Sequence, residues 1–96
     1  MISLFVALLF AHSEAGWIQN NPNYRDRQGI HCCSPHDCAV APHGAVSRVV
    51  DGWKVNATGR VFRDGDPDLY PSTDHQFWLC NRAGSDRCLF VPGADT

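Results

Sequence analysis

The sequence has little clustering of charge, no internal repeat and no low-complexity segment. Its 8 lysines and arginines and its 10 aspartates and glutamates are scattered, so that no run of like sign forms. This distribution argues against a nucleic-acid-binding arm, a polybasic membrane anchor and an acidic tail. Beyond the N-terminus no apolar run is long enough to cross a bilayer, and we expect no transmembrane segment in the mature chain.

Catalytic motifs are also missing. The chain has neither a thioredoxin-like C-x-x-C pair nor the C-x-x-C-H of haem attachment, and no glycine-rich phosphate loop, serine nucleophile elbow or H-E-x-x-H. A catalytic Cys–His pair stays open as an alternative, but no local signature supports it. We therefore predict a non-enzymatic binding or interaction module, with a protein or small-molecule partner and no bound nucleic acid.

What the chain does contain is cysteine, five residues in 96, in a sequence that is 44% hydrophobic and 10% aromatic. A chain of this length forms one small domain, which buries proportionally little surface and often needs covalent support. Disulfides persist in oxidising compartments and are rare in the cytosol. The cysteine content thus predicts a disulfide-stapled domain in a periplasmic or secreted protein.

The N-terminus agrees with export. Residues 2–10 form an apolar run of the length of a signal-peptide core, and small residues follow at Ala11, Ser13 and Ala15. Cleavage after Ala15 uses Ser-Glu-Ala, whereas cleavage after Ala11 leaves His12 as the first residue. We therefore expect a signal peptide over residues 1–15 and a single domain over residues 16–96. In that domain Trp17 and Tyr24 are candidate anchors of an irregular arm.

Three of the cysteines fall in the stretch IHCCSPHDC at residues 30–38. Ser34 is a good N-cap, Pro35 suits the first helical position, and the stretch therefore predicts a short helix that ends before Pro42. In that helix Cys33 and Cys38 occupy the two positions that touch in a hydrophobic staple.

The helical placement makes Cys33–Cys38 our predicted local bridge, and Cys80–Cys88 is the second local candidate. The alternative is that the N-terminal cysteines are bonded to the segment containing Cys80 and Cys88. One cysteine is left over in any arrangement, and we predict Cys32 as the free thiol, because bridging neighbouring cysteines strains the backbone. Structural zinc held by these cysteines is a further alternative.

The rest of the chain shows β signals. Residues 46–50, Asp51-Gly52 and residues 53–56 read as a hairpin in which Val50 faces Trp53. A short strand is expected at residues 60–63. Two strands at residues 76–80 and 88–91 are apolar on both faces and are expected to be the most buried pair, with Leu79 opposite Leu89. The residues expected to share the apolar face of the hairpin are Val46, Arg48, Val50, Trp53 and Val55. The fold class is accordingly a small β-rich (α+β) domain of antiparallel hairpins with one short N-terminal helical turn.

Several other residues are candidate sites. Asp64, Asp66 and Asp68 alternate as in a calcium loop, but the glycine and glutamate of that motif are missing, and a turn stabilised by local hydrogen bonds is favoured. Residues 56–58 form a glycosylation sequon, which has meaning only in a eukaryotic secretory pathway. Three tryptophans are expected in the core or, alternatively, on a binding platform. They are Trp17, Trp53 and Trp78.

Five histidines suggest a possible copper or zinc site. If cleavage follows Ala11, His12 offers its α-amine and its ring nitrogen to one metal ion, and a second imidazole from His36 or His75 completes a three-nitrogen site of the kind Cu(II) favours. A periplasmic metal-binding protein is therefore the alternative function. The prediction otherwise is that no cofactor is bound.

The chain resembles a family of small exported proteins of alphaproteobacteria. The matching stretches are CCSPHDC at residues 32–38, FRDGDPDLYPS at residues 62–72 and FWLCNRAGSDRCLFVPG at residues 77–93, together with His12, Gly16-Trp17 and Gly52-Trp53. The resemblance implies a cleaved signal peptide and a periplasmic or secreted location. It implies no activity.

Overall fold

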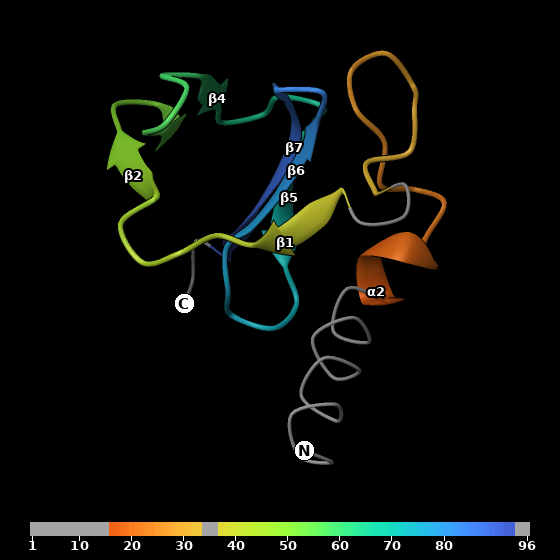
Figure 1. Ribbon diagram of the computed structural model, residues 1–96. Helices are drawn as coiled ribbons and strands as arrows, with labels where there is room; N and C mark the ends of the chain where they lie inside the picture. The colour runs from red at the N-terminus through yellow and green to blue at the C-terminus, as the bar shows by residue number, and fades with distance from the viewer. Residues whose placement is uncertain (1–15, 34–36, 94–96) are drawn as a thin grey trace, which may run out of the picture.

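The computed structural model describes residues 16–33 and 37–93, and all structural statements below concern these residues. They form a four-stranded sheet in the order β1-β6-β7-β5 and a three-stranded sheet in the order β2-β3-β4 (Figure 1). No helix among them is long and apolar enough to span a membrane. The elements are α2 (Gly16–Gln19), β1 (Cys38–Val40), β2 (Val46–Val49), β3 (Gly52–Val55), β4 (Val61–Arg63), β5 (Leu69–Ser72), β6 (Trp78–Arg82) and β7 (Ser85–Pro92).

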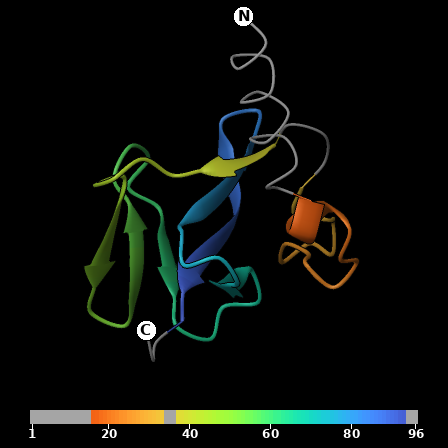
Figure 2. The same cartoon turned by 90° about the horizontal axis from the view of Figure 1, so that it is seen from below.

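The four-stranded sheet lies between the N-terminal arm, residues 16–33, and the three-stranded sheet (Figures 1 and 2). Strand β7 contributes to both interfaces because its side chains alternate. Cys88 and Phe90 belong to a core cluster with the arm, and Leu89 and Val91 belong to a second cluster with β3 and β4. The described residues therefore form a small β-rich domain with a short helix and two disulfides, and the predicted fold class is confirmed. The short helix lies at Gly16–Gln19, in the arm that was expected to be irregular.

Aromatic side chains hold the arm on the sheet. The Trp17 ring packs edge-to-face on Phe90 and on Tyr24, with ring centroids 5.2 Å and 5.7 Å apart. Tyr24 packs in the same way on Tyr70, with centroids 5.0 Å apart. The Tyr70 hydroxyl donates a hydrogen bond to the carbonyl of Arg25 at 2.6 Å and accepts one from its N–H at 2.9 Å. The expectation that Trp17 and Tyr24 anchor the arm is confirmed.

The predicted hairpin of β2 and β3 forms, but its register differs. Arg48 pairs with Trp53, and the turn consists of Val50 and Asp51, with Asp51 at φ 62°. Val50 thus does not face Trp53 but projects into solvent, 83% exposed. The difference is a two-residue shift, which leaves the strand faces unchanged because side chains alternate with period two.

Gly52 lies within β3 rather than in the turn, and a Cβ atom placed on it would come within 2.5 Å of the carbonyl oxygen of Phe62 on β4. Glycine is needed here because a neighbouring backbone approaches closely.

The predicted pairing of the last two strands is confirmed. Leu79 lies opposite Leu89 and Cys80 opposite Cys88, although the strands extend further than expected, to Arg82 and from Ser85. Strand β5 pairs with β7 in parallel, and no pattern in the sequence predicts this pairing. Pro71 sits on this edge strand, where a missing N–H is tolerated.

The predicted helix after Ser34 is wrong for the residues that can be compared. Ser34, Pro35 and His36 lie outside the described residues, whereas Cys38–Val40 form strand β1 on the edge of the sheet. Pairing with β6 outweighs the local helix signal, because β6 supplies backbone partners for the whole segment.

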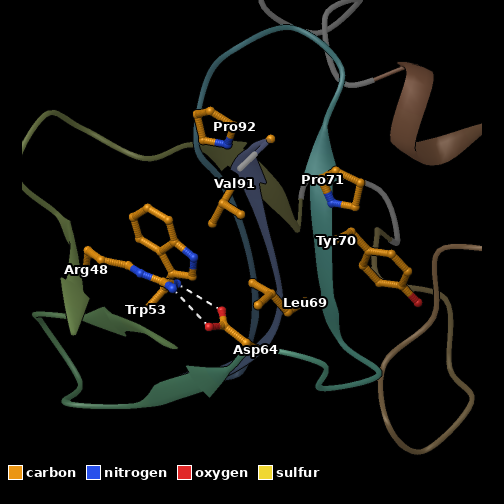
Figure 3. Close-up of a pocket in the computed structure, with 9 residues that line it drawn as sticks. Arg48, Trp53, Asp64, Leu69, Tyr70, Pro71, Val91 and Pro92 are labelled. Carbon is orange, nitrogen blue, oxygen red and sulfur yellow. Dashed lines mark hydrogen bonds and ion pairs between the residues drawn. The ribbon is translucent and has the colours of Figure 1, made fainter. Parts of the chain in front are cut away.

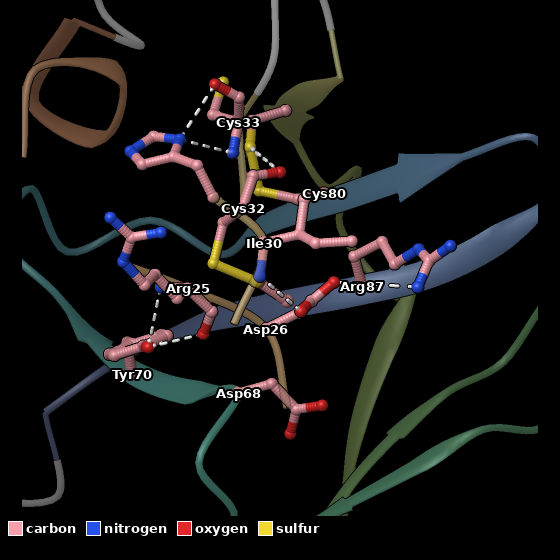
Figure 4. Close-up of a disulfide and its surroundings, with 12 residues drawn as sticks. Arg25, Asp26, Ile30, Cys32, Cys33, Asp68, Tyr70, Cys80 and Arg87 are labelled. Carbon is pink, nitrogen blue, oxygen red and sulfur yellow. Dashed lines mark hydrogen bonds and ion pairs between the residues drawn. A yellow bond between two sulfur atoms is a disulfide. The ribbon is translucent and has the colours of Figure 1, made fainter. Parts of the chain in front are cut away.

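The disulfides differ from the local pairing predicted above. Cys32 is bonded to Cys88 and Cys38 to Cys80, and Cys33 is the free thiol, buried at 6% exposure (Figure 4). The Cys33–Cys38 bridge, the Cys80–Cys88 bridge and the free Cys32 are therefore wrong, and the alternative that the N-terminal cysteines join the β6–β7 hairpin is correct. In this arrangement the four sulfurs are bonded in pairs and are not free to bind zinc, and zinc binding by the cysteines stays an alternative prediction.

The sheet order is the physical reason. Cys38, Cys80 and Cys88 stand side by side on β1, β6 and β7. Cys80 has a cysteine on each side and is bonded to the one on β1, with Cα atoms 4.0 Å apart. Cys88 is bonded instead to Cys32, which the arm brings over the same face.

Candidate functional site

A groove of about 540 Å³ opens between the two sheets (Figure 3). We call it the inter-sheet groove. Each sheet supplies one side of it, and the loops after β4 and β7 complete it. Its lining residues are Arg48, Trp53, Asp64, Leu69, Tyr70, Pro71, Val91, Pro92 and Gly93.

The floor of the groove is apolar. In the parallel pairing of β5 and β7, Pro71 lies beside Val91 and Leu69 beside Leu89. Leu69 and Val91 also belong to the core cluster between the sheets. An apolar ligand in the groove would therefore extend an existing hydrophobic core.

An ion pair closes one end of the groove. Nη1 and Nη2 of Arg48 donate to the two carboxylate oxygens of Asp64, each at 2.9 Å, and both side chains are 51% exposed. The Arg48 guanidinium also lies over the Trp53 ring at 5.0 Å. The two-pronged geometry and the aromatic contact fix the guanidinium in one position.

The local sequence places this pair. Arg48 and Trp53 are cross-strand partners in the hairpin, so that their side chains lie on the same face. Asp64 follows β4 directly, and its N–H donates to the carbonyl of Asp51 at 2.8 Å. That hydrogen bond holds the loop after β4 beside the β2–β3 turn.

The ion pair moves the pKa of each of its two groups further from pH 7. The hydrogen bonds from Arg48 lower the pKa of Asp64, and the same bonds raise the pKa of Arg48. Both groups are consequently charged near pH 7, and neither is poised to exchange a proton there.

The aspartates that resembled a calcium loop each have another role. Asp64 pairs with Arg48, Asp66 accepts from the N–H of Arg63 at 2.8 Å, and Asp68 is 1% exposed and bonded to arginines. The turn with local hydrogen bonds, favoured by the sequence, is the observed structure.

Asp68 is the centre of a second, structural cluster. It accepts hydrogen bonds from Arg27 of the arm and from Arg60 beside β4, each at 2.9 Å. Arg60 also donates to the carbonyl of Asp86 on β7. Burial alone would raise the pKa of Asp68, but the bonds from Arg27 and Arg60 outweigh it and hold this pKa below its ordinary value. The cluster joins the arm to both sheets.

The predicted metal ligands are not brought together in the described part of the chain. His12 and His36 lie outside it, and His75 is exposed in the loop between β5 and β6 with φ 63°. Among residues 16–33 and 37–93 no group of three or more His, Cys, Asp or Glu side chains is arranged to hold a metal ion. The copper site remains a prediction.

Two smaller hollows lie elsewhere on the described part of the chain. A hollow of about 510 Å³ lies beside residues 40–44, between the end of β1 and the start of β2. Another, of about 170 Å³, lies over the Asp68 cluster, where the carboxylates and guanidiniums already pair with one another. The inter-sheet groove differs from both because it combines an apolar floor with a fixed polar end.

The sequence held one signal for this site. Arg48 lies on the hairpin face that is otherwise formed by Val46, Trp53 and Val55. A charge on an apolar face requires a partner or a role. The sequence gives no sign that Asp64 is the partner, because Asp64 lies in a different turn, within a pattern that resembles a calcium loop.

Comparison of the chain with protein-family models, with curated proteins and with solved structures finds no match. The resemblance to small exported proteins of alphaproteobacteria therefore stays a prediction, and the function is argued from the inter-sheet groove.

Proposed function

We propose that this protein is an exported, non-enzymatic binding module and that its ligand occupies the inter-sheet groove. The observation that carries the proposal is the combination of an apolar floor at Leu69 and Val91 with the fixed Arg48–Asp64 pair at one end. Ligand sites typically enclose about 300–1,000 Å³, with mostly apolar walls and a few placed polar groups. The groove has these properties.

The scaffold supports binding because the groove is held in shape. Its floor belongs to paired strands β5 and β7, and its wall belongs to the β2–β3 hairpin. Two disulfides and the aromatic contacts of the arm hold the opposite face of the four-stranded sheet. A site shaped before the ligand arrives loses less entropy on binding than a flexible one.

The electrostatics favour recognition over catalysis. A general acid or base works best with a pKa near the working pH. The pKa of Asp64 is lowered and that of Arg48 is raised, which moves both away from that range. The pair is suited to orienting a ligand by hydrogen bonds.

Two observations support an exported location. Four of the five cysteines are paired as disulfides, which are compatible with an oxidising compartment. Residues 2–10 have the composition of a signal-peptide core.

A fragment screen by protein-observed ¹H–¹⁵N NMR tests the proposed binding site. Binding fragments should shift the backbone amides of Leu69 and Val91 and the indole N–H of Trp53. Pro71→Trp fills the groove and should abolish these shifts. Pro67→Trp, on the exposed turn before β5, is the matched control and should retain them. Binders that are unaffected by Pro71→Trp would place the site elsewhere.

A further inference from the structure

The geometry points to a ligand class, an inference that rests on the proposed function. We infer that the inter-sheet groove recognises a neutral, largely apolar molecule through an amide whose C=O and N–H point the same way, as in a primary carboxamide or a lactam. The amide oxygen accepts from Arg48, the amide N–H donates to Asp64, and the apolar part lies on Leu69 and Val91.

The charges that line the groove are balanced. Among the described residues, one cation and one anion line it, Arg48 and Asp64, and they neutralise each other. A carboxylate ligand would be attracted by Arg48 but repelled by Asp64. An ammonium ligand would be attracted by Asp64 but repelled by Arg48. A neutral ligand avoids both repulsions.

The ion pair retains hydrogen-bonding capacity. The bonds to Asp64 use two of the five N–H donors of a guanidinium and one lone pair on each carboxylate oxygen. Both side chains are half-exposed, so that their outer edges face solvent. A ligand can therefore bind the pair without breaking it.

The free edges of the pair place a donor beside an acceptor. Along each side of a two-pronged pair, an Nη atom of Arg48 and an oxygen of Asp64 lie next to each other, 2.9 Å apart. The unused N–H and the unused lone pair of these neighbouring atoms lie on the same edge of the pair. A primary carboxamide or a lactam has the complementary acceptor and donor side by side. A trans secondary amide does not, because its C=O and N–H point in opposite directions.

An apolar surface adjoins the pair. Leu69 and Val91 belong to the core between the sheets and line the groove together with Pro71, which lies beside Val91 (Figure 3). A short alkyl chain or an aliphatic ring attached to the amide buries its carbons there, and that burial is favourable. The pair then selects the head group, and the floor accepts the tail.

The test is a head-group series on the full, oxidised protein, followed by ¹H–¹⁵N NMR titration. Hexanamide and ε-caprolactam carry the matching amide, whereas hexanoate, hexylamine and N-methylhexanamide keep a similar tail with the wrong head group. We expect hexanamide and caprolactam to bind in the millimolar range and at least tenfold more tightly than the other three. The Trp53 indole N–H and the amides of Leu69 and Val91 report occupancy.

Two variants make the test specific. Asp64→Asn leaves Arg48 uncompensated, so its preference should move from hexanamide to hexanoate. Arg48→Met leaves Asp64 uncompensated and should favour hexylamine. Lys54→Gln, on the opposite face of the hairpin, should leave the wild-type preference unchanged. The dispersion of the NMR spectrum shows whether each variant is folded.

The outcomes separate the two proposals. If hexanoate, hexylamine or N-methylhexanamide binds the wild-type groove as well as hexanamide does, the amide inference is wrong and the groove remains a binding site. If no member of the series shifts the groove residues and the fragment screen is also negative, the proposed function fails.

Discussion

Cys38 and Cys80 lie directly opposite each other on β1 and β6, and their sulfur atoms are bonded. The other cross-strand neighbour of Cys80 is Cys88, whose bond goes to Cys32, 56 residues away in sequence. Both bridges consequently tie the segment before and within β1 to the β6–β7 hairpin. The arm and the edge strand are thus covalently held to the centre of the fold.

Removing either bridge should destabilise the protein strongly. Each bridge closes a long loop, and losing a native bridge from a small domain costs about 2–5 kcal/mol. We expect this loss in the double variants Cys32→Ala/Cys88→Ala and Cys38→Ala/Cys80→Ala, measured by urea unfolding without reductant. A free energy of unfolding within about 0.5 kcal/mol of wild type would mean that the bridge does not hold the fold.

Cys33→Ala is the matched control, because it removes a cysteine and keeps both bridges. We expect a loss of stability smaller than that of either double variant. Burial raises the pKa of the Cys33 thiol, so that it should react with a thiol reagent only slowly until the protein is unfolded. Unfolded wild-type protein should titrate one thiol and Cys33→Ala none. Five thiols would contradict both bridges.

Asp68→Asn should destabilise the protein by about 1–3 kcal/mol, because it removes the buried negative charge that accepts hydrogen bonds from Arg27 and Arg60. We expect a smaller loss of stability than for breaking a fully buried ion pair, because both arginines are partly exposed. The measurement is urea unfolding at pH 7. Asp64→Asn, in the exposed pair with Arg48, is the comparison and should change stability much less. Equal effects of the two substitutions would argue against the role assigned to Asp68.

The same carboxylate gives a pH dependence. The pKa of Asp68 is lower in the folded protein than in the unfolded chain. The charge of Asp68 therefore contributes fully to stability above its pKa in the unfolded chain, about 4, and this contribution is lost as the pH falls through its pKa in the folded protein. Wild type should therefore lose stability more steeply than Asp68→Asn as the pH falls below about 4. Parallel curves for the two proteins, from thermal unfolding at each pH, would refute this linkage.

Gly52→Ala should destabilise the second sheet. The new methyl would come within 2.5 Å of the carbonyl oxygen of Phe62, and backbone cannot yield cheaply. We expect a loss of about 1–3 kcal/mol by urea unfolding, as for other overpacked sites. Gly16→Ala, where the nearest atom is the Asn20 side-chain nitrogen at 3.7 Å, is the control and should be nearly neutral.

Export should leave a shortened chain. The prediction from residues 2–15 is a mature protein that begins at Gly16 or at His12. Intact-mass measurement of protein from a periplasmic fraction distinguishes these two starts. A chain that retains residues 1–10 would contradict export by this signal.

Much of the β structure was readable from the sequence. The apolar strands at residues 76–80 and 88–91 predicted the β6–β7 pair and its register, with Leu79 opposite Leu89. Gly84, with φ 81°, marks the turn between them. Period-two alternation also put Arg48 and Trp53 on one hairpin face, and a two-residue shift in register did not change that outcome. These features depend on neighbours along the chain or across one turn.

Tertiary structure decided the disulfides, strand β1 and the groove. The sequence favoured a helix near Cys38, but the free edge of β6 offered backbone partners and made it a strand. Once β1, β6 and β7 stand side by side, the nearest sulfurs are set by sheet order and not by separation in sequence. Arg48 meets Asp64 once β2, β3 and β4 have paired, and β5 lies beside β7 once those two strands have paired. The groove itself forms only when the two sheets pack against each other. Local preferences are small next to the free energy of long-range pairing and burial, and contacts between distant segments are therefore decided last.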